Sequence, residues 1–106
     1  MPKQGLDKKG DVGLKDKQKH KVEPPKKYKV VFHNDDYTPM DFVCQLLIQT
    51  FHKNEPAAKA ITLHVHEKGK GIAGIYSREI AETKTRDSLI IAKSHGHPLL
   101  IDFEPE

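Results

Sequence analysis

An acidic turn between an apolar strand and a helix constrains this chain more than any other feature. It consists of three residues with short polar side chains, Asn34, Asp35 and Asp36. Such side chains bond to nearby backbone and tolerate turn conformations, so we expect the apolar run 28–33 to be a strand that ends here. Thr38 is predicted as the N-cap of a helix, and Pro39 suits its first position. The turn should therefore lead directly into a helix.

The remaining elements follow from the spacing of apolar residues and from capping residues such as Asn54, Ser77 and Gly69. We predict helices over 39–53, 54–69 and 77–94, and further strands over 71–76 and 99–103. A sheet this small needs a helical layer to bury its apolar face. We therefore expect an α+β fold in the order β-α-α-β-α-β, a small α/β sandwich whose three-stranded antiparallel sheet has three helices packed on one side.

Composition divides the chain into two parts. Residues 1–27 carry nine lysines against four acidic residues and few apolar ones, whereas residues 28–106 carry a small excess of negative charge. A segment like 1–27 cannot bury enough apolar surface to offset its ordering entropy. We expect a disordered, lysine-rich tail over 1–27 and one folded domain over 28–106. A basic tail also leaves open a nucleic-acid binder, in which the tail would supply the affinity.

Several classes of function find little support in the sequence. No apolar run approaches the length of about 20 residues that spans a bilayer, and the single cysteine, Cys44, fits a reducing cytoplasmic setting. His64 and His66 lie two apart on a predicted helix and point away from each other, whereas His95 and His97 could converge across a turn at Gly96. With no second cysteine and no histidine pair at helical i, i+4 spacing, we expect no metal site. The chain has no nucleophile with a positioned base and no cofactor motif. We expect neither an enzyme nor a cofactor.

Two features need more than a structural explanation. Lys84 is predicted to lie between Ile80 and Ile91 on one stripe of the third helix. Such a lysine either extends its ammonium group to water or forms a charged contact with a partner protein. The second feature is a predicted cleft, because Thr62, Val65 and His66 share a face of the second helix and would oppose two apolar residues of the first helix. Those two residues are Met40 and Val43.

The predicted cleft lies beside the acidic turn, and this combination suits one kind of ligand. An α-amino group has a reference pKa of about 7.7–8.0, and neighbouring carboxylates favour its charged form. Burial of a large apolar side chain beside it contributes roughly 1.5–3 kcal/mol. The acidic turn and the cleft together therefore suit a ligand in which a cationic group lies next to an apolar one.

The chain resembles the ClpS family of bacterial adaptors. The resemblance lies in residues 34–40 (Asn-Asp-Asp-Tyr-Thr-Pro-Met), followed by Phe42-Val43, Val65-His66, Gly69-Lys70, residues 81–84 (Ala-Glu-Thr-Lys) and residues 97–99 (His-Pro-Leu). It spans about residues 24–104. The resemblance implies a monomeric adaptor that recognises proteins beginning with Leu, Phe, Tyr or Trp, called N-degrons. It would deliver them to the ClpAP protease by docking on the N-terminal domain of the ClpA unfoldase.

The resemblance also implies roles for individual residues. The α-amino group and the following backbone would be bound by Asn34, Asp35, Asp36 and His66. The first side chain would lie in a pocket lined by Thr38, Met40, Val43, Thr62, Val65 and Leu99, with Met40 as the gatekeeper that excludes branching at Cβ. The unfoldase would dock on Glu79, Glu82, Thr83 and Lys84. An alternative within the same family resemblance is a regulator that binds the unfoldase without using the pocket.

One residue departs from the family pattern. Thr62 stands where the family commonly has methionine, on the side of the helix that faces the predicted pocket. A shorter, hydroxyl-bearing residue should enlarge the pocket and make it more polar. We therefore expect altered discrimination at the first position of the substrate, including tolerance of Ile or Val.

Overall fold

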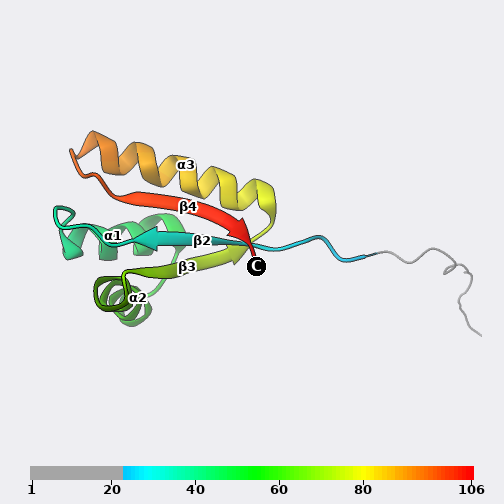
Figure 1. The fold of residues 1–106 in the computed structure, drawn as a ribbon, viewed down its shortest axis with the longest axis horizontal. Coiled ribbons are helices and arrows are strands. Elements are labelled where there is room, and N and C mark those ends of the chain that lie inside the picture. The colour runs from blue at the N-terminus through cyan, green and yellow to red at the C-terminus, as the bar shows by residue number, and fades with distance from the viewer. Residues whose placement is uncertain (1–22) are drawn as a thin grey trace, which may run out of the picture.

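The computed structural model describes residues 23–106, so most of the predicted lysine-rich tail lies outside the described residues. The elements follow in the expected order (Figure 1): β2 (Tyr28–His33), α1 (Met40–Phe51), α2 (Glu55–Lys68), β3 (Lys70–Tyr76), α3 (Arg78–Ser94) and β4 (Leu100–Pro105). The strand order is β3-β2-β4, and β2 is antiparallel to both neighbours. The predicted α+β fold, with three helices packed on a three-stranded antiparallel sheet, is confirmed. Among the described residues, no helix has the length and apolar character needed to cross a membrane.

Local capping explains most of the helix boundaries. Asn54 accepts a hydrogen bond from the backbone N–H of Ala57 at 2.9 Å, and Ser77 accepts one from Ile80 at 3.4 Å. Gly69 ends α2 in the left-handed conformation, with φ of 92°. The predicted caps at these three positions are confirmed.

The predicted N-cap at Thr38 is wrong. The first helix begins at Met40, and its N-cap is Pro39, which has an extended backbone and makes no side-chain capping bond. The Thr38 hydroxyl instead donates to Oδ2 of Asp35 at 2.8 Å. The Thr38 hydroxyl, which was expected to cap the helix, is therefore bonded to the carboxylate of the turn instead. The helix also ends at Phe51, earlier than predicted, because His52 adopts a left-handed conformation with φ of 58°.

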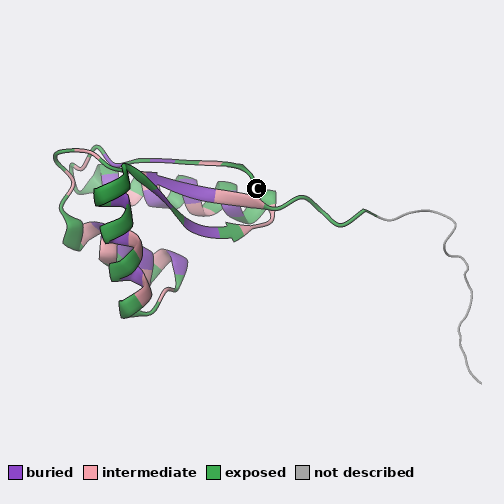
Figure 2. Ribbon diagram, turned by 60° about the horizontal axis from the view of Figure 1, so that its bottom comes forward, coloured by how far each residue is buried: buried purple, intermediate pink, exposed green. Residues whose placement is uncertain are grey.

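The core lies between the sheet and the helices. In Figure 2 the buried residues gather along the strands and on the helix faces turned toward them. Val30 and Phe32 of β2 and Leu47 of α1 are completely buried. Phe32 also packs edge-on against Phe51, with ring centroids 5.4 Å apart. The central strand and α1 thus form a rigid support for the turn that connects them.

The third helix approaches the sheet with small residues. Its buried face consists of Ala81, Thr85, Ser88 and Ala92. Ile80, which shares a stripe of this helix with Lys84 and Ile91, is 49% exposed. Close approach of the helix backbone to the sheet selects small side chains on the buried face and leaves the larger apolar residue outside.

Candidate functional site

The turn after β2 is braced by the side chain of Asp35. Its Oδ1 accepts hydrogen bonds from the backbone N–H groups of Tyr37 at 2.8 Å and Thr38 at 2.7 Å, and its Oδ2 accepts from the Thr38 hydroxyl. The backbone N–H of Asn34 donates to the carbonyl of Gly69 at 2.8 Å. The turn is therefore fixed internally and is also joined to the end of α2.

The same contacts set the charge of Asp35. Partial burial raises the pKa of this carboxyl. The hydrogen bonds from Thr38 and Tyr37, together with the nearby His97, lower the pKa by more than burial raises it. The net result is a pKa below the usual range of an aspartate. Asp35 is therefore a carboxylate at neutral pH and contributes negative charge beside the turn.

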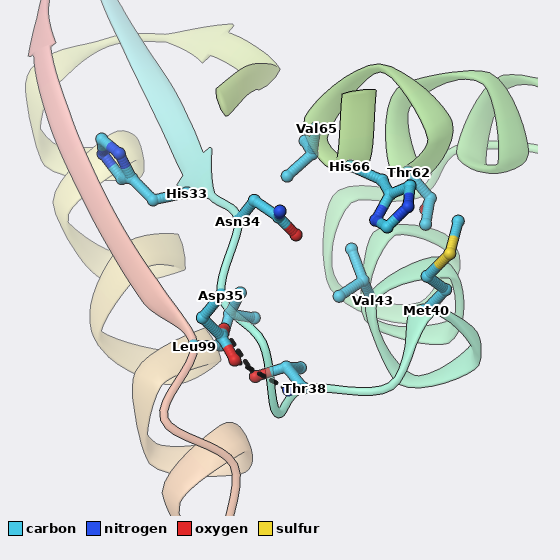
Figure 3. Close-up of a pocket in the computed structure, with 10 residues that line it drawn as sticks. All are labelled: His33, Asn34, Asp35, Thr38, Met40, Val43, Thr62, Val65, His66 and Leu99. Carbon is cyan, nitrogen blue, oxygen red and sulfur yellow. Dashed lines mark hydrogen bonds between the residues drawn. The ribbon is translucent and has the colours of Figure 1, made fainter. Parts of the chain in front are cut away.

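A small cavity lies between this turn and the two first helices (Figure 3). Its walls come from the end of β2, the start of α1, the second half of α2 and the residue before β4. The lining residues are His33, Asn34, Asp35, Thr38, Met40, Val43, Thr62, Val65, His66 and Leu99. All six residues predicted for the apolar pocket line this cavity.

The cavity has an apolar interior and a polar rim. Val43, Val65 and Leu99 are buried with 6%, 3% and 5% of their surface exposed. On the rim, the amide of Asn34 points into the cavity, and His66 lies on the opposite side (Figure 3). The arrangement can hold a polar head at the rim and an apolar group within.

Three of the four polar residues predicted to bind the α-amino group and the backbone of the substrate lie around the cavity. Asn34, Asp35 and His66 line the cavity, but Asp36 does not and is exposed next to it. The oxygens of Asp35 already accept three hydrogen bonds from the turn. Of the two carboxylates, Asp36 is the one left open to solvent and to a ligand.

One lining residue was not predicted. His33 borders the cavity as the last residue of β2, but its imidazole points away from Asn34 (Figure 3), and its Nε2 lies 3.1 Å from Oδ2 of Asp102. Successive residues of a strand point to opposite faces. This alternation could have predicted that His33 lies next to the site while its ring faces Asp102 on the other side of the strand.

The residues predicted to contact a partner lie elsewhere. Glu79, Glu82 and Thr83 are exposed on the first half of α3, which starts at the opposite end of the sheet from the turn after β2 (Figure 1). Lys84 is half-buried, and its Nζ donates to the carbonyl of Thr50 at 2.7 Å. The cavity and this α3 surface are therefore two separate regions.

Lys84 also has aromatic neighbours. Its ammonium lies 5.7 Å from the ring centre of Phe51 and 5.4 Å from that of Tyr76. The lysine thus joins α3 to the end of α1 and to β3. Neither of the two interpretations from the sequence included this internal bond.

The histidines next to the site form an aromatic cluster. The rings of His95 and His97 are stacked with centroids 6.2 Å apart, and Phe42 packs against His97 at 4.6 Å. In residues 23–106, no group of three or more histidine, cysteine, aspartate or glutamate residues lies close enough to hold a metal ion.

Comparison with known proteins decides what kind of molecule carries this cavity. The family model described as "ATP-dependent Clp protease adaptor protein ClpS" matches residues 23–102. The chain belongs to the ClpS family. It is thus an adaptor of the Clp protease and not an enzyme. The ClpS match covers the whole described fold except its last four residues.

Individual ClpS proteins are similar along most of their length. The ClpS of Hydrogenovibrio crunogenus is 51% identical over 84 residues, which cover 79% of this chain and 81% of that protein. The ClpS of Clostridium acetobutylicum is 52% identical over 83 residues, with 78% and 82% covered. Among solved structures, Agrobacterium tumefaciens ClpS2 bound to L-phenylalaninamide has a TM-score of 0.76 and 37% identity. That likeness covers 78% of this chain and 100% of the ClpS2 chain.

Proposed function

We propose that the cavity binds the first residue of substrate proteins that begin with a bulky hydrophobic residue. The α-amino group would lie at the rim, beside Asn34, Asp36 and His66, and the side chain would enter the apolar interior. The observation that carries this proposal is the pairing of a polar rim with an apolar interior in one small cavity. Recognition of such N-degrons would make the adaptor a selector of proteins for degradation.

Electrostatics supports the same placement of the amine. Asp35 remains ionised at neutral pH because of the hydrogen bonds it accepts, and the neighbouring Asp36 carboxylate is exposed. Two carboxylates favour the protonated form of a nearby amine and attract it. In this proposal Asp36 contacts the ammonium directly, whereas Asp35 mainly holds the turn in shape.

The structural neighbour supports the choice of ligand. The compound bound to Agrobacterium tumefaciens ClpS2, L-phenylalaninamide, has a free α-amino group, an aromatic side chain and an amide in place of the next peptide bond. These are the features of the first residue of a peptide. The amine and the aromatic side chain correspond in polarity to the rim and the interior of the cavity in this chain.

A binding comparison tests the proposal. We expect a fluorescent peptide that begins with leucine and has a free amine to bind, and the same peptide with an acetylated amine not to bind. Asp36→Asn should weaken binding roughly tenfold or more, because it removes a charged hydrogen-bond partner. The control Asp87→Asn removes an exposed carboxylate of α3 and should bind as the unaltered protein does. Equal binding of both peptides would refute the proposal.

We further propose that the exposed first half of α3 docks on the N-terminal domain of the ClpA unfoldase. Glu79, Glu82 and Thr83 are exposed among residues 23–106, and they lie away from the cavity. Substrate and unfoldase could therefore be held at the same time. Thr83→Arg should abolish capture of the isolated ClpA domain, whereas Gln45→Arg, which adds the same side chain to the exposed surface of α1, should not.

A further inference from the structure

A groove runs along the flank of α3 that borders β4. Its volume is about 400 Å³, and its lining residues are Glu82, Thr85, Arg86, Leu89, Ile90, Lys93 and Phe103. Lys84, which bonds to Thr50 of α1, extends from the opposite flank of the helix. The groove shares no residue with the cavity, and it shares only Glu82 with the surface proposed to dock on ClpA. It is therefore a separate feature that the proposed function does not use.

The strand beside the groove has a free edge. Within residues 23–106, β4 pairs with β2 alone, whereas the other edge strand, β3, has α2 lying beside it (Figure 1). The unpaired edge of a strand presents backbone N–H and C=O groups that can bond to a further strand. Proteins commonly block such edges with lysine or proline, but residues 100–104 of β4 contain neither. An extended chain can therefore pair with β4 along the groove.

The groove has an apolar floor. Leu89 and Phe103 are half-buried, and Ile90 is 60% exposed. Thr85 is 6% exposed, and its hydroxyl has no hydrogen-bond partner within residues 23–106. Burial of an unpaired polar group destabilises a protein, and a ligand that supplies a partner removes that cost. The groove thus combines apolar surface with a polar side chain that lacks a partner.

Charges on the rim of the groove favour an acidic occupant. Arg86 and Lys93 are exposed and lie about two helical turns apart. Within the described residues, Lys93 has no ion pair, and Arg86 has one long contact, 3.8 Å from its Nε to Oδ1 of the adjacent Asp87. Among the described lining residues, Glu82 is the only acid. Segment 1–22 of this chain carries seven lysines against three aspartates, so the rim cations repel it. The occupant should therefore come from another protein.

We propose that an extended, acidic segment of a partner protein joins the sheet as a fourth strand at the free edge of β4. Its apolar side chains pack on Leu89, Ile90 and Phe103, and its carboxylates lie beside Arg86 and Lys93. The adaptor thus has a second binding site, which takes an internal segment of a protein and needs no free N-terminus. This inference does not depend on the binding of N-terminal residues by the cavity.

The geometry of the two elements specifies a probe. Arg86 and Lys93 are seven residues apart, which is about 10 Å along a helix, and every fourth residue of a strand lies on the same face about 13 Å apart. The probe therefore has two threonine–valine–threonine–glutamate repeats, in which valine and glutamate alternate on the face that meets the groove. Its N-terminus is acetylated, so it offers no amine to the cavity, and its C-terminus carries a fluorophore. The matched probe has lysine in place of each glutamate.

The paired probes test the charge of the occupant. We expect the full-length protein to bind the glutamate peptide about tenfold more tightly than the lysine peptide, with an affinity that falls as the salt concentration rises. Equal affinities for the two peptides, or no binding of the glutamate peptide, would overturn the proposal.

Charge reversal locates the binding site. Arg86→Glu combined with Lys93→Glu should reverse the preference, so that the lysine peptide binds about tenfold more tightly than the glutamate peptide. Lys59→Glu combined with Lys68→Glu makes the same change of charge on the exposed surface of α2 and should leave the preference unaltered. An unaltered preference in the groove variant contradicts the proposal. The groove variant should still bind a free-amine peptide that begins with leucine, which separates this site from the cavity.

Two further substitutions test the floor of the groove. Ile90→Asp should weaken binding of the glutamate peptide about tenfold, whereas Ile80→Asp, at an isoleucine of the same helix that is 49% exposed, should not. Thr85→Val removes the hydroxyl at nearly constant shape. It should weaken binding and raise the Tm of the free protein, because the hydroxyl has no partner within residues 23–106. Equal losses of binding in Ile90→Asp and Ile80→Asp would exclude the groove as the site.

Amide hydrogen exchange tests the addition of a strand. The glutamate peptide should slow exchange of the amides on the free edge of β4 and leave the amides of β3 unchanged. Binding without slower exchange in β4 overturns the fourth strand. A peptide of residues 1–22 that displaces the glutamate peptide would identify this chain's own segment as the occupant, and dimerisation that Ile90→Asp abolishes would identify a second copy. Either result overturns the proposal.

Discussion

Replacing Asp35 by alanine should destabilise the protein measurably, because this side chain braces the turn that forms the cavity. The substitution removes three hydrogen bonds, two from backbone N–H groups and one from the Thr38 hydroxyl. A net hydrogen bond contributes about 0.5–1.5 kcal/mol, and solvent screening at this partly exposed group argues for the lower half of that range. We therefore expect a loss of about 2 kcal/mol in the free energy of unfolding.

Thermal and urea denaturation measure this loss. For a domain of this size, about 2 kcal/mol corresponds to a fall in Tm of roughly 8–16 °C. The matched control is Asp36→Ala, since Asp36 is exposed and holds no side-chain hydrogen bond within residues 23–106. It should leave Tm nearly unchanged while weakening peptide binding. Equal effects of the two substitutions on Tm would refute the division of roles between the two carboxylates.

The pH dependence gives a second readout of the Asp35 brace. The pKa of Asp35 is lower in the folded protein than its usual value, so its stabilisation is fully present above the unfolded pKa of about 3.9. The stabilisation is lost as the pH falls through the lowered folded pKa. The difference in unfolding free energy between the protein and Asp35→Ala should be constant from about pH 8 to 5 and should shrink below about pH 4.

Three further substitutions test how the fold supports the site. Leu47→Ala empties a fully buried position and should lower the unfolding free energy by about 2–5 kcal/mol in urea denaturation. Lys84→Met removes the hydrogen bond to Thr50 and the aromatic contacts, and a loss of about 1–2 kcal/mol is expected, whereas an unchanged Tm would show that these contacts contribute nothing. Gly71→Ala brings a Cβ to 2.9 Å from Val65, so it should cost about 1–3 kcal/mol and weaken peptide binding by shifting α2.

Most of the fold could be predicted because its boundaries are set locally. The caps at Asn54 and Ser77 and the left-handed Gly69 act within a few residues of the chain, so sequence patterns reveal them. Thr38 was mispredicted because two local uses of its hydroxyl compete, a helix cap and a bond to Asp35, and only the folded turn decides between them. The exposure of Ile80 could not be predicted, because helical periodicity records hydrophobicity and not the closeness of a helix to a sheet.

Which residues line the cavity could be predicted from the sequence, but the contacts that each of them makes could not. The residues predicted for the apolar pocket line one cavity, and all of them except Thr62 were located by a motif. The sequence could not show that the Asp35 carboxylate accepts hydrogen bonds from the backbone of the turn. It also could not show that Lys84 donates a hydrogen bond to Thr50, which is 34 positions away in the chain.

The most direct test of the central claim is a nuclear magnetic resonance titration of the protein with L-phenylalaninamide and with its N-acetylated form. The claim is that the cavity binds an apolar side chain together with a free α-amino group. We predict that the free amine shifts the resonances of Asn34, Val43, Val65 and Leu99, and that the acetylated compound shifts none of them. Equal shifts with both compounds, or shifts confined to α3, would contradict the claim.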